Sequence, residues 1–158
     1  MAIAPNKKYM AVAERADKAM ITIYDLHTLK RRKVLQTGEC GSEAYVSLAF
    51  SPDGKMLAAQ GGAPEWNLVL WVWEKTKVGA MIKSTNQQAS PIFQVCFNPS
   101  DGSLLTCAGS QIFKSFRVSE VPPTATLSTP DGIHDSIPAS LLGSRDVAQA
   151  VDRLTAPR

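Results

Sequence analysis

Short apolar runs alternate with turn-forming clusters along residues 1–118. The runs at 45–50 and 92–97 contain mainly aliphatic and aromatic residues, and each leads into a polar cluster, at 51–54 and 98–102. Both clusters have proline at their second position and end in Asp-Gly. Proline presets the φ angle, and Asp-Gly accepts the left-handed conformation of a tight turn. The pattern therefore predicts antiparallel strands joined by hairpin turns.

The same pattern occurs three times at a fixed interval. Pro5, Pro52 and Pro99 are 47 residues apart. The apolar residues that open the following strand keep this interval: Met10, Leu57 and Leu104. After a loop of varying length, each copy has a third strand that ends in an aromatic residue and a polar residue. Third strands are expected at 19–25, 68–74 and 111–117, and fourth strands at 32–36 and 78–82.

The phased pattern resembles the WD40 repeat, in which about 40–45 residues form one four-stranded blade of a β-propeller. Phe followed by Ser-Pro or Asn-Pro, and the aromatic–polar pair, carry the match. The repeat's opening Gly-His is absent, and its closing Trp-Asp is replaced by Tyr-Asp, Trp-Glu and Phe-Arg. The resemblance implies an all-β fold, an incomplete WD40 β-propeller of about two and a half blades. The blades are expected at about 1–36, 45–82 and 92–118.

A closer resemblance lies in three segments, 7–15, 21–35 and 61–69. They look like the N-terminal propeller of the cilia- and flagella-associated WD-repeat proteins. Those large axonemal proteins join propellers to a long coiled coil and help to position dynein arms and regulatory complexes. The resemblance implies a non-enzymatic interaction scaffold of the cytoplasm, cytoskeleton and ciliary axoneme, with axonemal or dynein-associated proteins as partners. A general cytosolic WD40 adaptor outside cilia is the alternative.

So few blades do not close a ring. Propellers usually have 4–8 blades, and each blade buries its apolar face only against its neighbours. The outer blades are therefore expected to expose apolar surface. Two explanations stay open: the chain is a fragment or truncated isoform of a longer protein, or it is an open half-propeller that a partner completes.

Residues 119–158 break the repeat. The stretch 121–130 is rich in Pro, Ser and Thr, which is the composition of a linker. The tail is therefore expected to be mostly disordered. Ser144 is a candidate N-cap for a short helix at 144–155, although a helix of this length is only marginally stable by itself.

Composition argues against several functional classes. The cysteines (Cys40, Cys96 and Cys107) and the histidines (His27 and His134) are scattered. This spacing predicts neither a metal site nor a nucleophile–base pair. The glycines form no phosphate-binding motif, and the formal charge of +3 is small for a nucleic-acid binder. No apolar run approaches the roughly 20 residues that span a bilayer. We therefore predict no enzyme activity, no cofactor and no nucleic-acid or membrane partner.

Two features are candidates for contact with a partner. The run Lys30, Arg31, Arg32 and Lys33 is suited to an acidic surface, such as that of tubulin, or to nucleic acid. The alternative is a solvated edge strand on which cations discourage pairing with another sheet, and the absence of interleaved aromatic residues weighs against nucleic acid. Trp66 precedes the third strand of the second copy. Its indole is either an exposed contact or packed against its own loop.

Overall fold

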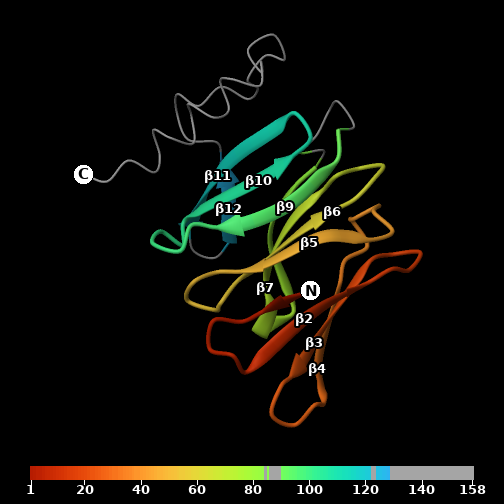
Figure 1. The fold of residues 1–158 in the computed structure, drawn as a ribbon, viewed down its shortest axis with the longest axis vertical. Helices are drawn as coiled ribbons and strands as arrows, with labels where there is room; N and C mark the ends of the chain where they lie inside the picture. The colour runs from red at the N-terminus through yellow and green to blue at the C-terminus, as the bar shows by residue number, and fades with distance from the viewer. Residues whose placement is uncertain (84, 86–89, 122–123, 129–158) are drawn as a thin grey trace.

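The computed structural model describes residues 1–83, 85, 90–121 and 124–128, and it consists of three four-stranded antiparallel sheets (Figure 1). The sheets follow one another along the chain. Within each sheet, strands that are consecutive in sequence are neighbours in space. Apart from one short 3-10 turn, the regular secondary structure of these described residues is entirely β-strand.

The first sheet is built from two hairpins that follow each other in sequence. Its strands are β1 (Ala2–Ile3), β2 (Tyr9–Glu14), β3 (Met20–Asp25) and β4 (Arg31–Gln36). Ala11 lies opposite Ile23, and Ala13 lies opposite Ile21. Small residues therefore face large ones across the β2–β3 pair, on the side of the sheet that is buried.

The second sheet is the middle one of the three. Its strands are β5 (Tyr45–Phe50), β6 (Leu57–Gly61), β7 (Leu68–Val72) and β8 (Lys77–Ile82). The third strand of this copy was expected to reach residue 74, but it ends at Val72. Trp73–Lys75 form the 3-10 turn η1, which Thr76 terminates with a φ of 55° and an N–H donated to the Trp73 carbonyl oxygen at 3.1 Å.

The third sheet has one strand more than the sequence predicted. Its strands are β9 (Ile92–Phe97), β10 (Leu104–Gly109), β11 (Ile112–Val121) and β12 (Thr124–Ser128). Strand structure thus continues past residue 118, where we expected the propeller segment to end. Within the stretch whose composition predicted a linker, residues 124–128 pair with β11, since Thr favours strands and β11 offers an unpaired edge. The helix expected at 144–155 lies outside the described residues.

Alternate residues of the middle sheet pack against different neighbours. On β7, Val69 and Trp71 belong to a hydrophobic cluster shared with the first sheet. Leu68 and Leu70 belong to a second cluster shared with the third sheet. A strand buried on both faces needs a continuous apolar run rather than alternation, and the apolar sequence of β7 satisfies that need.

The first strands of the sheets gather toward one line. β5 lies beside β9 (Figure 1). β1 and β2 both approach β5, while the last strands β8 and β12 lie beside each other. Sheets arranged radially around a line in this way are the blades of a propeller. The prediction of an all-β, incomplete propeller is confirmed.

Candidate interaction surface

The β3–β4 hairpin holds the predicted cationic run at one end of the first sheet. The Asp25 Oδ1 accepts hydrogen bonds from the backbone N–H groups of His27 (2.9 Å) and Thr28 (3.0 Å). The N–H of Asp25 donates to the carbonyl oxygen of Lys30 at 3.0 Å. These contacts, the hydrogen bond from Thr28 above all, hold the pKa of the Asp25 carboxyl below its ordinary value. The turn is therefore closed by an ionised aspartate.

The four cations of the run are not equivalent. Lys30, Arg31 and Arg32 are exposed, whereas Lys33 is half-buried. Lys33 lies opposite Ile23, whose side chain is fully buried, so Lys33 is on the face of β4 that turns toward the second sheet. Among the described residues, none of the four forms an ion pair with a carboxylate. The three exposed cations are therefore available to bind an external partner.

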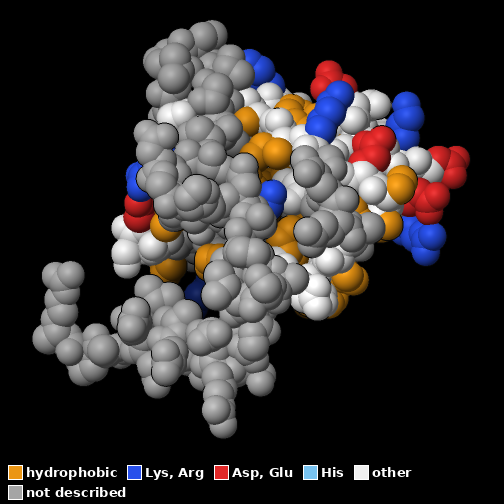
Figure 2. All heavy atoms as spheres, turned by 90° about the horizontal axis from the view of Figure 1, so that it is seen from above, with side chains coloured by type: hydrophobic (Ala, Val, Ile, Leu, Met, Phe, Trp, Pro, Cys, Tyr) orange, Lys and Arg blue, Asp and Glu red, His pale blue; other side chains and the backbone are white. Residues whose placement is uncertain are grey.

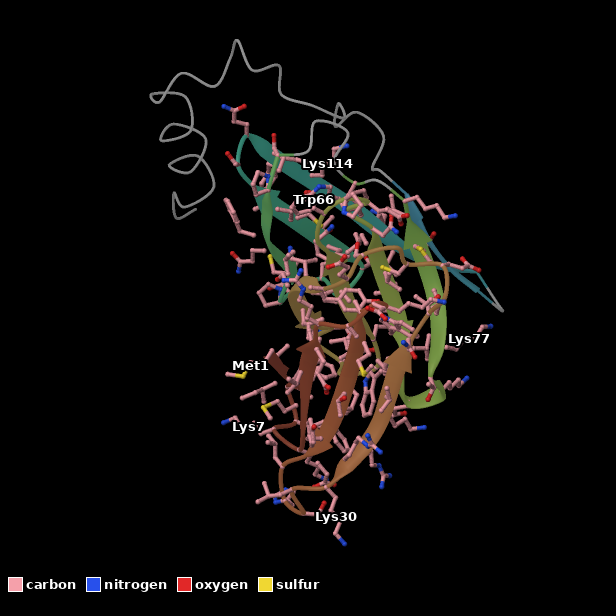
Figure 3. All side chains as sticks on the ribbon, turned by 90° about the vertical axis from the view of Figure 1, so that its right-hand side faces the viewer. Met1, Lys7, Lys30, Trp66, Lys77 and Lys114 are labelled. Carbon is pink, nitrogen blue, oxygen red and sulfur yellow. The ribbon has the colours of Figure 1, made fainter. Side chains whose placement is uncertain are left out.

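Two cations that the sequence analysis missed lie at the same end of the sheet. Lys7 and Lys8 are exposed on the β1–β2 turn, and the Lys8 carbonyl oxygen accepts a hydrogen bond from the N–H of Leu26 at 2.8 Å. Figure 3 shows Lys7 and Lys30 at the same, lower end of the molecule. Alternate turns of an antiparallel meander always lie at one end, so the strand spacing carried this signal.

Trp66, the other contact candidate, is not a surface residue. Its side chain is only 8% exposed and packs in the cluster between the second and third sheets. The Trp66 N–H donates to the Gly62 carbonyl oxygen (3.0 Å), and its own carbonyl oxygen accepts from the Thr85 N–H (3.1 Å). The loop folds back on itself and buries the indole, so of the two alternatives the structure has the packed indole and not the exposed contact.

A buried polar network holds this loop in place. The Gln60 side chain is fully buried, and its Nε2 donates to the Trp66 carbonyl oxygen and to Thr85 Oγ1, both at 3.1 Å. From the third sheet, the Cys107 thiol donates to Gln60 Oε1 at 3.7 Å. Burial raises the pKa of that thiol to about 12, so it stays protonated. A buried amide requires such partners, and the network joins two sheets.

The part of the chain that the structure describes contains no cluster of His, Cys, Asp and Glu suited to a metal ion. Its histidine, His27, is exposed on the β3–β4 turn, and His134 lies outside the described residues. No helix in the described part has the length and apolar character needed to cross a membrane.

Comparison with known proteins finds relatives of this chain, although no family model matches it. Over 123 residues the chain is 42% identical to cilia- and flagella-associated protein 57 of Mus musculus, covering 76% of this chain and 10% of that protein. The chain belongs to the family of cilia- and flagella-associated proteins. A second relative is cilia- and flagella-associated protein 44 of Mus musculus, 32% identical over 114 residues, which are 72% of this chain and 6% of that protein.

A third relative comes from an alga. Cilia- and flagella-associated protein 43 of Chlamydomonas reinhardtii is 27% identical over 141 residues, covering 67% of this chain and 8% of that protein. The chain spans a tenth or less of the length of these relatives. The closer resemblance that the sequence suggested is confirmed.

A solved structure supports the fold independently. The β-propeller domain of Cps50 (Swd1) from Myceliophteria thermophila matches with a TM-score of 0.59 at 16% identity, covering 80% of this chain and 36% of that one. At this identity the likeness concerns the fold alone. This coverage is what a part of a β-propeller should give, because most of this chain matches about a third of a larger propeller.

Proposed function

We propose that the chain is a protein-binding part of a β-propeller scaffold in the ciliary or flagellar axoneme, without enzyme activity. The observation that carries the proposal is the 42% identity over 123 residues to a cilia- and flagella-associated protein. That association is a property of a much longer protein, of which the aligned segment is 10%. Propeller blades are rigid and present turns and loops at their ends, which suits them to holding other proteins.

Within this scaffold, we assign the chain a part in the assembly or positioning of dynein arms, and hence in cilium motility. The support is the resemblance of 7–15, 21–35 and 61–69 to propellers of axonemal proteins. The exposed cations Lys30, Arg31 and Arg32 are the proposed contact with a protein partner, and Lys33 contributes from the half-buried face of β4.

Localisation tests the scaffold role. The chain, expressed with a small tag in ciliated cells, is expected to remain with the axoneme after the membrane is removed by detergent. The matched control is the same cell line before it forms cilia, where the chain should be extractable. Complete release with the soluble fraction in both conditions would favour a cytosolic adaptor and contradict the proposal.

The dynein-related part needs a separate test. Cells that lack the protein carrying this segment are expected to beat their cilia more slowly, and tomograms of their axonemes should lack density at or beside the dynein arms. Restoring the full protein should recover both features. Axonemes with complete dynein arms and normal beating would retain the scaffold role but remove its connection with dynein.

A further inference from the structure

We propose that the basic end of the first sheet binds an acidic polypeptide segment that carries an apolar side chain among its carboxylates. By basic end we mean one set of residues from two neighbouring turns and the start of β4: Lys7, Lys8, Leu29, Lys30, Arg31 and Arg32. The inference deepens the proposed scaffold function, on which it rests, because it states the chemistry of one partner.

Backbone hydrogen bonds fix the two turns relative to each other. Tyr9 at the start of β2 lies opposite Asp25 at the end of β3. The Leu26 N–H then donates to the Lys8 carbonyl oxygen at 2.8 Å, so the second turn is bonded directly to the first. Within the first turn, Asn6 Oδ1 accepts from the Lys8 N–H at 2.9 Å. The cations therefore stand on a prearranged platform, which lowers the entropy cost of binding.

The basic end has little negative charge of its own. Its carboxylate is that of Asp25, at the end of β3. This carboxylate already accepts hydrogen bonds from two backbone N–H groups of the β3–β4 turn. On the adjacent turn of the second sheet, the Asp53 carboxylate already pairs with Lys55 at 3.7 Å. Five exposed cations, on two joined turns and the start of β4, create a local positive potential that attracts and orients an acidic partner.

The opposite end of the same sheet has the reverse balance. The end of β2, the β2–β3 turn and the connection from β4 to β5 contain four acidic and two basic residues: Glu14, Asp17, Glu39, Glu43, Arg15 and Lys18. Arg15 and Glu43 form an ion pair there at 3.0 Å. The positive charge is thus concentrated at one end of the sheet and is not a general property of a chain whose formal charge is only +3.

The exposed side chain of Leu29 favours a polypeptide over a nucleic acid as the partner. Its side chain is 79% exposed at the tip of the hairpin, and its φ of 55° is a conformation that leucine adopts rarely and asparagine or glycine readily. An aliphatic side chain amid cations offers a contact for an apolar residue but none for a phosphate. Of the two tyrosines of this sheet that could stack on a base, Tyr9 already packs on Trp73 with ring centroids 5.0 Å apart, and Tyr24, opposite Arg31, is half-buried.

The test measures fluorescence anisotropy of labelled probes with the whole 158-residue chain. The probes are a peptide of repeated Glu-Glu-Leu-Glu units, the same peptide with Ser in place of Leu, and a single-stranded thymidine oligonucleotide of similar length. We expect the leucine-containing peptide to bind most tightly. Its affinity should fall as salt rises toward about 0.15 M, because the contact is partly electrostatic.

Two variants locate the binding surface. The charge-reversed variant K30E/R31E/R32E is expected to weaken binding of both peptides at least about tenfold. Leu29→Asn keeps a residue that suits the positive φ, and should weaken only the leucine-containing peptide, by about three- to tenfold. The control K18E/K77E/K83E makes the same change in net charge at exposed lysines elsewhere and should bind like the unchanged chain.

Circular dichroism verifies that each variant is folded. If the charge reversal unfolds the chain, K7A/K8A takes its place with a smaller expected loss of about threefold. Equal loss in the control, tighter binding of the oligonucleotide, or an unchanged response of Leu29→Asn would each overturn the inference. A chain that stays with axonemes but binds no acidic peptide would retain the scaffold role and reject this partner.

Discussion

At the scale of single residues, Trp71 and Trp73 stabilise the fold in different ways. The Trp73 Nε1 donates to the Gly54 carbonyl oxygen at 2.8 Å, and its ring packs on those of Tyr9 (5.0 Å) and Phe50 (6.0 Å). It thereby connects the first sheet with the β5–β6 turn. Trp71 is 1% exposed, and within the described part of the chain its Nε1 has no hydrogen-bond partner. Its contribution is packing alone.

Replacing each of these tryptophans by phenylalanine separates the contribution of the hydrogen bond from that of packing. Trp73→Phe removes the hydrogen bond to the half-buried Gly54 carbonyl oxygen, so it should lower the unfolding free energy by about 1 kcal/mol more than Trp71→Phe does. Urea denaturation of the whole chain, followed by circular dichroism, measures the difference. An equal or larger cost for Trp71→Phe would mean that the Trp73 hydrogen bond contributes little.

The cysteines also differ by position rather than by sequence context. Cys96 is exposed, whereas Cys40 and Cys107 are buried. Burial raises the pKa of Cys107 to about 12, which leaves almost no reactive thiolate at neutral pH. A disulfide reagent such as Ellman's should therefore modify one thiol quickly in the native chain and all three in urea. Cys96→Ser should abolish the fast phase; its persistence would show that a buried thiol is accessible.

At the scale of elements, the hairpin turns are held by their own side chains. In the β9–β10 turn, Asn98 Oδ1 accepts from the backbone N–H of Ser100 (2.9 Å) and Asp101 (3.2 Å). Asp101 Oδ1 accepts from the Ser103 N–H (3.0 Å) and hydroxyl (2.6 Å). The residue types Asn, Pro, Asp and Gly predicted the turn, but which side chain accepts from which donor became visible only in the structure.

These bonds make the stability of the third sheet depend on pH. The hydrogen bonds from Ser103, its hydroxyl first, lower the pKa of Asp101 from its ordinary 3.8. A lowered folded-state pKa gives stability that is present above pH 3.8 and lost as pH falls through the folded value. Between pH 7 and about pH 3, the melting temperature of Asp101→Asn should therefore fall less than that of the unchanged chain. Identical losses in both chains would exclude a contribution from Asp101.

At the scale of the whole molecule, the outer sheets each have one face that no other described sheet covers. In the third sheet, Phe93 and Phe113 are 66% and 59% exposed, and Phe113 lies opposite Ala108 on the face away from the second sheet. Figure 2 shows hydrophobic side chains at the surface among charged side chains of both signs. Exposed apolar sheet faces favour association.

This exposure predicts self-association of the isolated chain. The variant F93S/F113S should remain monomeric at concentrations where the unchanged chain forms larger species, as measured by light scattering after gel filtration. Its stability should change by no more than about 1 kcal/mol, since both rings are already largely in water. Leu29→Asn, which removes an exposed apolar residue from a hairpin tip, is the control and should associate like the unchanged chain. Equal association of all three would point to another surface.

The local pattern of the chain determined the strands and turns, because alternation of side chains and turn propensity act over a few residues. The proline-phased repeat was therefore enough to predict three sheets, and the strands expected at 19–25 and 32–36 are β3 and β4 to within one residue. Contacts between distant residues were decided only by packing. Tertiary structure buried Trp66 against the third sheet, around the amide of Gln60.

The same distinction explains the remaining differences. β12 forms because β11 offers it a backbone edge, which composition alone does not reveal. Lys7 and Lys8 join the cations of the β3–β4 hairpin because an antiparallel meander returns its alternate turns to one end of the sheet. Sequence fixes what each short segment can become, whereas burial and backbone pairing between segments decide which side chains meet and which remain in water.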